Sequence, residues 1–179
     1  MWPRGSSRQA TEVSAHENLP PPDEYFTLWV LIAQTRDAML RARERDYARY
    51  GISNESRAIL WLIQNNGGRA NPVEIARDLF RELHSVTEML KRMEKDELIT
   101  RYRGTGRSKV EVGLTEKGLD VFNQSLHNET DKRTFSVLNA EEREQLASYL
   151  WKLRSKAFQD LGIPEWQVHG PLNPGGAER

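Results

Sequence analysis

Residues 71–118 read NPVEIARDLFRELHSVTEMLKRMEKDELITRYRGTGRSKVEVGLTEKG, and they carry the clearest fold signal in the chain. Its first part carries two amphipathic helix signals separated by a turn. Its last part carries two short β-like runs, at residues 98–103 and 109–114, which are split by Gly-Thr-Gly-Arg at residues 104–107. Two helices followed by a basic hairpin is the element order of a winged helix-turn-helix, in which the second helix enters the major groove of DNA.

The helix signals in this stretch are specific. Asn71 is a capping residue, Pro72 suits the first helical position, and Glu74 lies three residues after the cap, where it can complete a capping box. A second helix is predicted from about His84 to Asp96, and its inward stripe consists of Val86, Met89, Leu90 and Met93. The opposite face supplies the candidates for contact with bases or phosphates, which are His84, Ser85, Thr87, Glu88 and Lys91.

Positive charge gathers at the predicted hairpin, or wing. Between residues 99 and 110 there are four basic residues and no acidic ones; the basic residues are Arg101, Arg103, Arg107 and Lys109. Arg107 is the strongest candidate, because an arginine at a thin glycine-flanked tip suits a narrow, negative minor groove. The other three are candidates for contact with the DNA backbone. Any of the four could instead be an ordinary solvated side chain.

Two carboxylates lie near the same predicted surface. Glu82 and Glu88 would repel phosphate. A carboxylate in the major groove can accept a hydrogen bond from the cytosine amino group, but its commoner role is local pairing with neighbouring basic side chains. The sequence leaves both interpretations open.

Helices are also predicted on both sides of this stretch. The first runs from about Glu24 to Tyr50, and its first half is apolar nearly all round, which predicts burial against more than one partner. Gly51 is expected to end it, and Ser53 to cap the next helix. After the hairpin, Thr115 and Asn139 are expected to cap two more helices, the second with an apolar stripe of Leu146, Tyr149, Leu150, Leu153, Ala157 and Leu161.

Composition excludes several classes of function. The 26 basic and 26 acidic residues balance, which argues against a non-specific polyelectrolyte binder. There are no cysteines, so disulfide and thiolate chemistry are excluded. No run reaches the roughly 18 apolar residues of a membrane span, and the N-terminus lacks the apolar core of a signal peptide. No metal-binding or catalytic arrangement is recognised, so we expect no enzyme activity, no metal and no cofactor. The lack of cysteines fits a reducing compartment, and we expect a cytoplasmic location.

Three short motifs resemble those of the MarR family of winged helix-turn-helix transcriptional regulators. Residues 50–53, YGIS, resemble the family's YGLT entry to the second helix. Residues 90–99, LKRMEKDELI, resemble its LVDRLEKKGLI exit from the recognition helix, and residues 114–118 match its LTEKG closure of the wing. The resemblance covers roughly residues 24–161. The chain departs from the family in lacking a glycine before the recognition helix and an acid beside Arg107.

The resemblance implies a mainly α fold with a small β-hairpin wing, and dimerisation helices at both ends of the chain. The boundaries expected from it are flexible tails at 1–22 and 164–179, a dimerisation region at 23–50 and 119–163, and a DNA-binding domain at 51–118. It implies a homodimer, most simply a repressor, that binds double-stranded DNA at a pseudo-palindromic operator and is released by a small aromatic or phenolic effector. Candidates to line an effector pocket are Trp29, Arg36 and Trp61, although tryptophans at helical spacing also serve as core. The alternative is a winged-helix module that binds proteins, without sequence-specific DNA binding.

Overall fold

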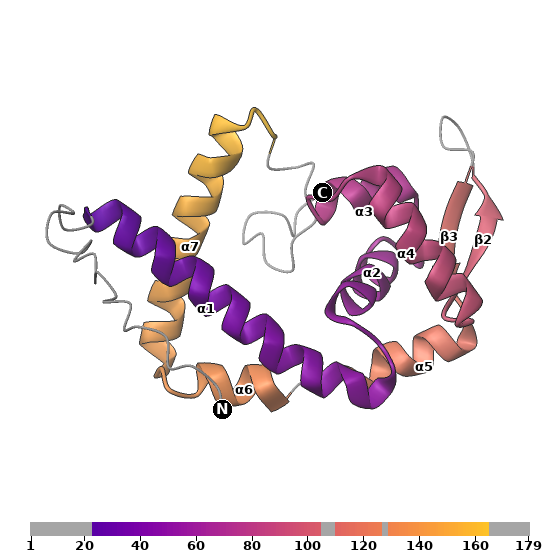
Figure 1. The fold of residues 1–179 in the computed structure, drawn as a ribbon, viewed down its shortest axis with the longest axis horizontal. Helices are drawn as coiled ribbons and strands as arrows, with labels where there is room; N and C mark the ends of the chain where they lie inside the picture. The colour runs from indigo at the N-terminus through magenta and orange to yellow at the C-terminus, as the bar shows by residue number, and fades with distance from the viewer. Residues whose placement is uncertain (1–22, 105–109, 127–128, 165–179) are drawn as a thin grey trace, which may run out of the picture. The chain divides into compact units, whose positions relative to one another are not determined.

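The computed structural model describes residues 23–104, 110–126 and 129–164. Figure 1 labels the helices and strands in chain order. Their bounds are α1 Glu24–Tyr47, a 3-10 turn Ala48–Tyr50, α2 Asn54–Asn65, β1 Arg69–Ala70, α3 Pro72–Asp78, α4 Leu83–Lys95, β2 Ile99–Arg103, β3 Val110–Leu114, α5 Glu116–Gln124, α6 Glu129–Phe135 and α7 Ala140–Asp160. The predicted fold class, mainly α with a small β wing, is confirmed.

Side-chain caps start the helices where the sequence predicts. The Asn71 side chain accepts a hydrogen bond from the Glu74 amide at 2.9 Å, and the Glu74 carboxylate accepts one from the Asn71 amide at 3.2 Å. Asn139 and Glu142 form the same capping box at the start of α7. Ser53 and Thr115 cap α2 and α5. These four predictions are confirmed, because each depends on residues no more than three positions apart.

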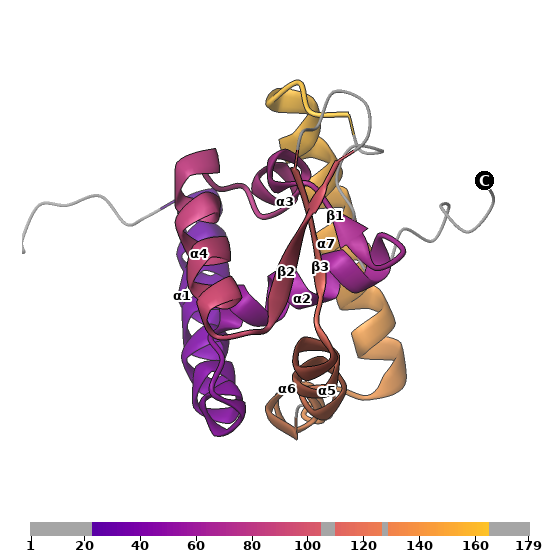
Figure 2. The same cartoon turned by 90° about the vertical axis from the view of Figure 1, so that its right-hand side faces the viewer.

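The wing is part of a three-stranded antiparallel sheet with the order β1-β3-β2. In Figure 2 the long strands β2 and β3 run side by side, and their register pairs Ile99 with Leu114 and Arg103 with Val110. On its other edge β3 pairs with the two-residue strand β1. The sequence does not predict β1, because two residues are too few to carry an alternating pattern.

The core lies between α2, α4 and the sheet. Ile59, Leu60 and Ile63 on α2 are fully buried, as are Val86 and Leu90 on α4. The helix α5 closes the core at the end of the sheet, where Phe122 is buried. The buried residues of α2 and the predicted inward stripe of α4 therefore form one continuous core, which fixes the orientation of α4.

Two helices end at a residue other than glycine in the left-handed conformation. Gly51 has φ +70°, as the sequence predicts, but Phe80 after α3 and Glu97 after α4 have φ +52° and +60°. At Phe80 the amide of Arg81 donates to Ala76 O at 2.9 Å and the amide of Phe80 donates to Arg77 O at 3.1 Å. The amides of Leu98 and Glu97 donate to Met93 O and Glu94 O in the same way. Both ends are Schellman motifs, in which glycine is the usual left-handed residue.

The first helix ends earlier than predicted. The α-helical part of α1 stops at Tyr47, and one 3-10 turn continues to Tyr50 before Gly51. Tyr47 is 2% exposed, and its hydroxyl accepts a hydrogen bond from Arg43 at 2.8 Å.

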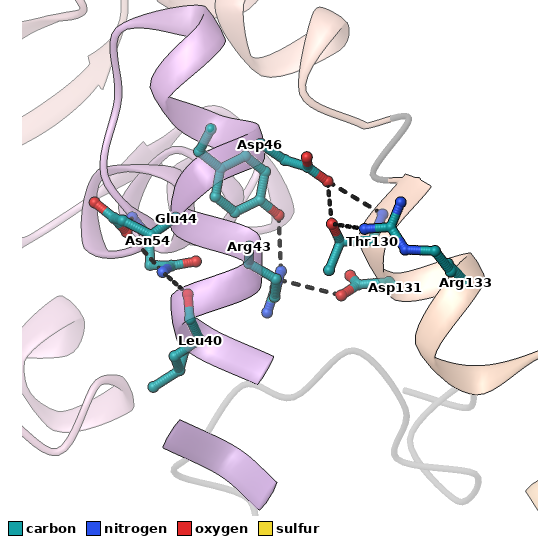
Figure 3. A network of polar contacts seen from close by, with 9 residues as sticks. Leu40, Arg43, Glu44, Asp46, Asn54, Thr130, Asp131 and Arg133 are labelled. Carbon is teal, nitrogen blue, oxygen red and sulfur yellow. Dashed lines mark hydrogen bonds and ion pairs between the residues drawn. The ribbon is translucent and has the colours of Figure 1, made fainter. Parts of the chain in front are cut away.

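The short helix α6 was not predicted from the sequence. Its Thr130 lies against Asp46 of α1: the Thr130 amide donates to the Asp46 carboxylate at 3.1 Å, and the Thr130 hydroxyl donates to the same carboxylate oxygen (Figure 3). Arg43 and Asp131 form an ion pair with 3.4 Å between the Arg43 Nε and the Asp131 Oδ1. Residues 84 positions apart thus fix α6 to the second half of α1.

On its other side, α1 is fixed to the start of α2. The backbone amide of Asn54 donates to the Glu44 carboxylate at 2.9 Å, and its side-chain amide donates to Leu40 O at 2.8 Å (Figure 3). Polar contacts therefore hold the start of α2 against the second half of α1, in addition to the packing of Tyr47 in the core.

Asp46→Asn is expected to reduce stability at neutral pH. The hydrogen bond from the Thr130 hydroxyl is the largest of the contacts that hold the pKa of Asp46 below its usual value of 3.8. A carboxyl whose pKa is depressed on folding stabilises the protein above its unfolded pKa, and loses that contribution as the pH falls through the folded value. Denaturant titrations of both proteins from pH 7 to pH 2 should show the wild-type advantage declining below about pH 3.8. Asp120→Asn, on the exposed face of α5, is the control, and an equal response of both variants would contradict the assignment.

The chain divides after Arg36 into two compact units. In the first unit, large apolar side chains of α1 are exposed to between 41% and 75%; they are Tyr25, Phe26, Leu28, Trp29, Leu31 and Ile32. In the second unit, the predicted stripe of α7 is also largely exposed, with Leu153 at 55% and Tyr149 at 52%. None of the helices in the described ranges is long and apolar enough to cross a membrane.

Candidate nucleic-acid interface

The helix α4, which the sequence predicts to be the recognition helix, presents a polar face because its apolar residues are buried in the core. Val86, Leu90 and Met93 are buried, with at most 2% exposure. Of the predicted contact residues, His84, Glu88 and Lys91 are exposed, while Ser85 and Thr87 are half-buried. The Thr87 hydroxyl donates to Leu83 O at 2.8 Å, which leaves its methyl group and oxygen lone pairs for an outside partner.

Glu88, one of the two carboxylates predicted near this face, forms a local ion pair. Glu88 accepts a hydrogen bond from Lys91 at 2.7 Å. That bond and the charge of Lys91 hold the pKa of Glu88 below its usual range, so Glu88 is ionised at neutral pH. A second pair, at 3.9 Å, joins Arg81 to Glu55 on α2. Glu82 precedes α4, and its side chain does not cap the helix. In the free protein Glu88 therefore neutralises Lys91.

The predicted wing residues divide into three groups. The Arg101 Nε donates to Glu94 on α4 at 2.8 Å, so Arg101 braces the wing against the recognition helix. Arg103 is exposed at the end of β2. Arg107 and Lys109 lie outside the described residues.

One wing contact was missed in the sequence. The Arg69 guanidinium lies 4.0 Å from the centre of the Tyr102 ring and 3.8 Å from the Glu111 carboxylate. The three residues come from β1, β2 and β3, and together they cover one face of the sheet. A sequence signal for this arrangement is lacking, because it depends on the unpredicted strand β1.

A cavity of about 600 Å³ lies between the start of α2 and one side of α4. Its apolar lining includes Met89, Met93 and Leu98, and its polar lining includes His84 and Arg92. This volume lies within the range that holds a small organic ligand. Its lining also includes Ser85 and Glu88, so three of the candidates for contact with DNA border the cavity.

The residues predicted to line an effector pocket lie elsewhere. Trp29 and Arg36 are exposed residues of the first unit, and Trp61 is half-buried against the core. None of the three lines the cavity between α2 and α4. Within the described ranges there is also no group of three or more His, Asp or Glu side chains that could hold a metal ion.

Comparison with known proteins gives a consistent result. Residues 52–106 match the family model described as MarR family. The organohalide-sensing transcriptional regulator RdhR, in its 2,4-dichlorophenol-bound form, is 30% identical, with a TM-score of 0.71 over 85% of this chain and 95% of its own. MepR of S. aureus bound to DNA is 26% identical, with a TM-score of 0.63 over 75% of this chain and 99% of its own. A mutant MarR of E. coli bound to operator DNA is 22% identical, with a TM-score of 0.67 over 73% and 95%. No curated protein sequence matches the chain.

Proposed function

The chain belongs to the MarR family, and from this we propose that it is a transcriptional regulator that binds double-stranded operator DNA as a homodimer. The observation that carries the proposal is the amphipathic helix α4, whose buried face is part of the core and whose polar face is exposed beside a basic wing. A helix of this kind is fixed in orientation and can enter a major groove. The exposed Lys91 and Arg103 are proposed as contacts to the DNA, together with Arg107 and Lys109 of the predicted wing.

The proposed dimer uses both ends of the chain. Contiguous exposed apolar surface marks a site of association in a protein. Such surface occurs in the first half of α1, and α7 exposes a second apolar stripe. We therefore assign residues 23–50 and 119–163 to dimerisation and residues 51–118 to DNA binding. Two symmetric recognition helices require a pseudo-palindromic operator.

Repression is the simplest regulatory outcome, because a dimer on an operator excludes other proteins from that DNA. A regulator that reads DNA works in the compartment that holds it, so we place the chain in the cytoplasm. We propose that the protein acts by binding DNA and does not catalyse a reaction.

Arg103→Ala is expected to weaken operator binding about tenfold and to reduce the slope of log affinity against log salt by about one. The physical reason is that one lost phosphate contact releases about one counterion fewer. Operator DNA selected from a random duplex library can be titrated at several salt concentrations by fluorescence anisotropy. Lys132→Ala is the matched control, because Lys132 is an exposed basic residue that lies on α6 and not on a strand of the wing.

The same titration separates the two functions left open by the sequence. Wild-type affinity that depends steeply on salt supports DNA binding, because phosphate contacts release counterions. Failure to select any duplex, or an affinity insensitive to salt, would favour a winged-helix module that binds a protein partner.

We further propose that a small phenolic compound occupies the cavity between α2 and α4. The bound ligand of RdhR, 2,4-dichlorophenol, is of this class. The cavity supports the proposal because Met89 and Met93 offer apolar contact and Arg92 offers a cation to a phenolate.

Met89→Trp is expected to fill the cavity and to weaken binding of 2,4-dichlorophenol at least about tenfold, since an added ring removes the space that the ligand needs. Isothermal titration calorimetry measures this directly. Gln64→Trp, on the exposed end of α2, adds the same side chain outside the cavity and should leave the affinity unchanged. Equal binding by the Met89 variant would place the ligand elsewhere.

A further inference from the structure

Phe80 occupies the turn between α3 and the recognition helix in a conformation that glycine normally supplies. Its φ of +52° is left-handed, which costs a residue with a side chain roughly 1–2 kcal/mol. Strain of this size persists where surrounding contacts determine the conformation. The hydrogen bonds of the Schellman motif do not explain the choice of phenylalanine, because they are made by the backbone and a glycine would make them too.

The side chain of Phe80 supplies the explanation. Its ring centroid lies 5.5 Å from that of Phe158 on α7, and the two ring planes are tilted by 41°. Aromatic pairs at this separation stabilise each other beyond the area that they bury. With this left-handed backbone the Phe80 residue, 53% exposed overall, places its ring against Phe158 of α7. A glycine would have relieved the strain and removed this contact.

Phe158, the partner of Phe80, lies on α7. It is 6% exposed and is the only buried residue of α7. The Arg154 guanidinium also lies over the Phe158 ring, 4.7 Å from the ring centroid. The predicted apolar stripe of α7, to which Phe158 does not belong, is largely exposed, including Leu150 and Leu153. One aromatic pair thus connects α7 to the turn before α4.

We propose that Phe80 and Phe158 form a positioning contact that fixes the recognition helix relative to the dimerisation helix α7, and so sets the distance between the two recognition helices of the dimer. The inference rests on the proposed function, in which α7 dimerises and α4 reads DNA. In a dimeric helix-turn-helix protein that distance determines the half-site spacing that can be bound. Phe80 and Phe158 touch no DNA in this scheme; they act through the placement of α4.

The distance between recognition helices can be measured without DNA. The chain has no cysteines, so Lys95→Cys on the exposed side of α4 gives a single site for a spin label in each subunit. Double electron–electron resonance then reports the distribution of distances between the two labels of the dimer. We expect Phe80→Gly and Phe158→Ala each to broaden that distribution at least about twofold, and the double variant to broaden it no further, because both remove the same contact.

Glu97→Gly is the matched control. Glu97 also occupies the left-handed position of a Schellman motif, and its side chain is 80% exposed. The substitution relieves the same backbone strain as Phe80→Gly without removing an aromatic contact, so the distribution should stay narrow. Phe158→Tyr keeps the ring and is expected to restore the wild-type width, which a general loss of stability could not do.

DNA binding supplies the second measurement. Affinity is measured for the selected operator and for a copy with one extra base pair between its half-sites. The wild-type protein should bind the selected spacing more tightly than the lengthened one. In Phe158→Ala the ratio of these two affinities should fall about tenfold. Unchanged label distances in both phenylalanine variants would overturn the positioning role while leaving the DNA-binding proposal intact. Broadened distances in a protein that selects no DNA would support the contact and overturn the proposed function. Absence of a dipolar signal in wild type would overturn both, since it would show that the chain does not dimerise.

Discussion

Gly118→Ala is expected to lower the free energy of unfolding by about 3 kcal/mol, at the upper end of the range for overpacked sites. A Cβ atom built on Gly118 would lie 1.9 Å from the backbone oxygen of Leu98 and 2.9 Å from its carbonyl carbon. Backbone atoms cannot rotate out of the way as a side chain can. Either α5 or the entry to β2 must move, and both contribute residues to the buried core, Phe122 from α5 and Leu98 before β2.

Hydrogen bonds hold α5 in this close approach. The Thr115 hydroxyl donates to Glu97 O at 2.5 Å, and the Thr115 amide donates to Leu98 O at 3.2 Å. Lys117 donates to Asp96 O at 2.8 Å. Relief of the clash would break some of these bonds, so the wing and the recognition helix would lose their fixed relation.

Thermal unfolding followed by circular dichroism measures the effect. A loss of about 3 kcal/mol corresponds to a fall in Tm of roughly 10 °C for a domain of this size. Asp120→Ala, two residues later on the exposed face of α5, is the control and should change stability by no more than about 0.5 kcal/mol. A Gly118→Ala protein that melts with the wild type would show that α5 does not approach β2 this closely.

Trp29→Glu is expected to weaken the proposed homodimer at least about a hundredfold. Trp29 is 66% exposed in the first unit of the chain, among the other large apolar side chains of α1. If this surface is buried in the dimer, a glutamate there leaves an unpaired charge in each subunit, at a cost of several kcal/mol. Operator affinity should fall as well, because a monomer contacts one half-site.

Sedimentation velocity over a range of protein concentrations measures the dimer directly. Gln34→Glu introduces the same charge at an exposed polar position of the same helix and should leave the dimer intact. A dimer that survives Trp29→Glu and dissociates no more than the Gln34 variant would place the interface elsewhere on the chain.

Features encoded within a few residues were predictable from the sequence. The Asn71 and Asn139 capping boxes need residues three positions apart, and the stripe containing Val86 and Leu90 follows the helical period. Residues 114–118, which match the family's wing closure, likewise include Gly118. The structure explains why this residue is a glycine, because its backbone approaches that of Leu98 too closely for a Cβ atom.

Features that depend on distant contacts were not predictable. The helix α6 is polar and has no apolar stripe that would predict it. Its Thr130 is buried, and donates hydrogen bonds to Asp46, which lies 84 positions earlier in the chain. The left-handed backbone at Phe80 carries no local signal either, since its ring meets Phe158 on another helix.

The candidate DNA surface shows the same division. The basic run of the wing was visible in the sequence, but its charges differ in role. Arg101 of β2 is bound to Glu94 of α4, the helix that precedes this strand, whereas Arg103 is exposed. Which of these side chains contact bases stays a prediction that the variants above can test.

The strand order β1-β3-β2 also bears on the behaviour of the protein at high concentration. It leaves β2 as an outer strand of the sheet, with backbone groups on its free side. Such a strand can pair with the same strand of another molecule and start aggregation, and charged side chains along it oppose this. Arg101 and Arg103 occupy β2. Variants that neutralise the wing should therefore be checked by light scattering, since a loss of colloidal stability would lower the apparent DNA affinity by itself.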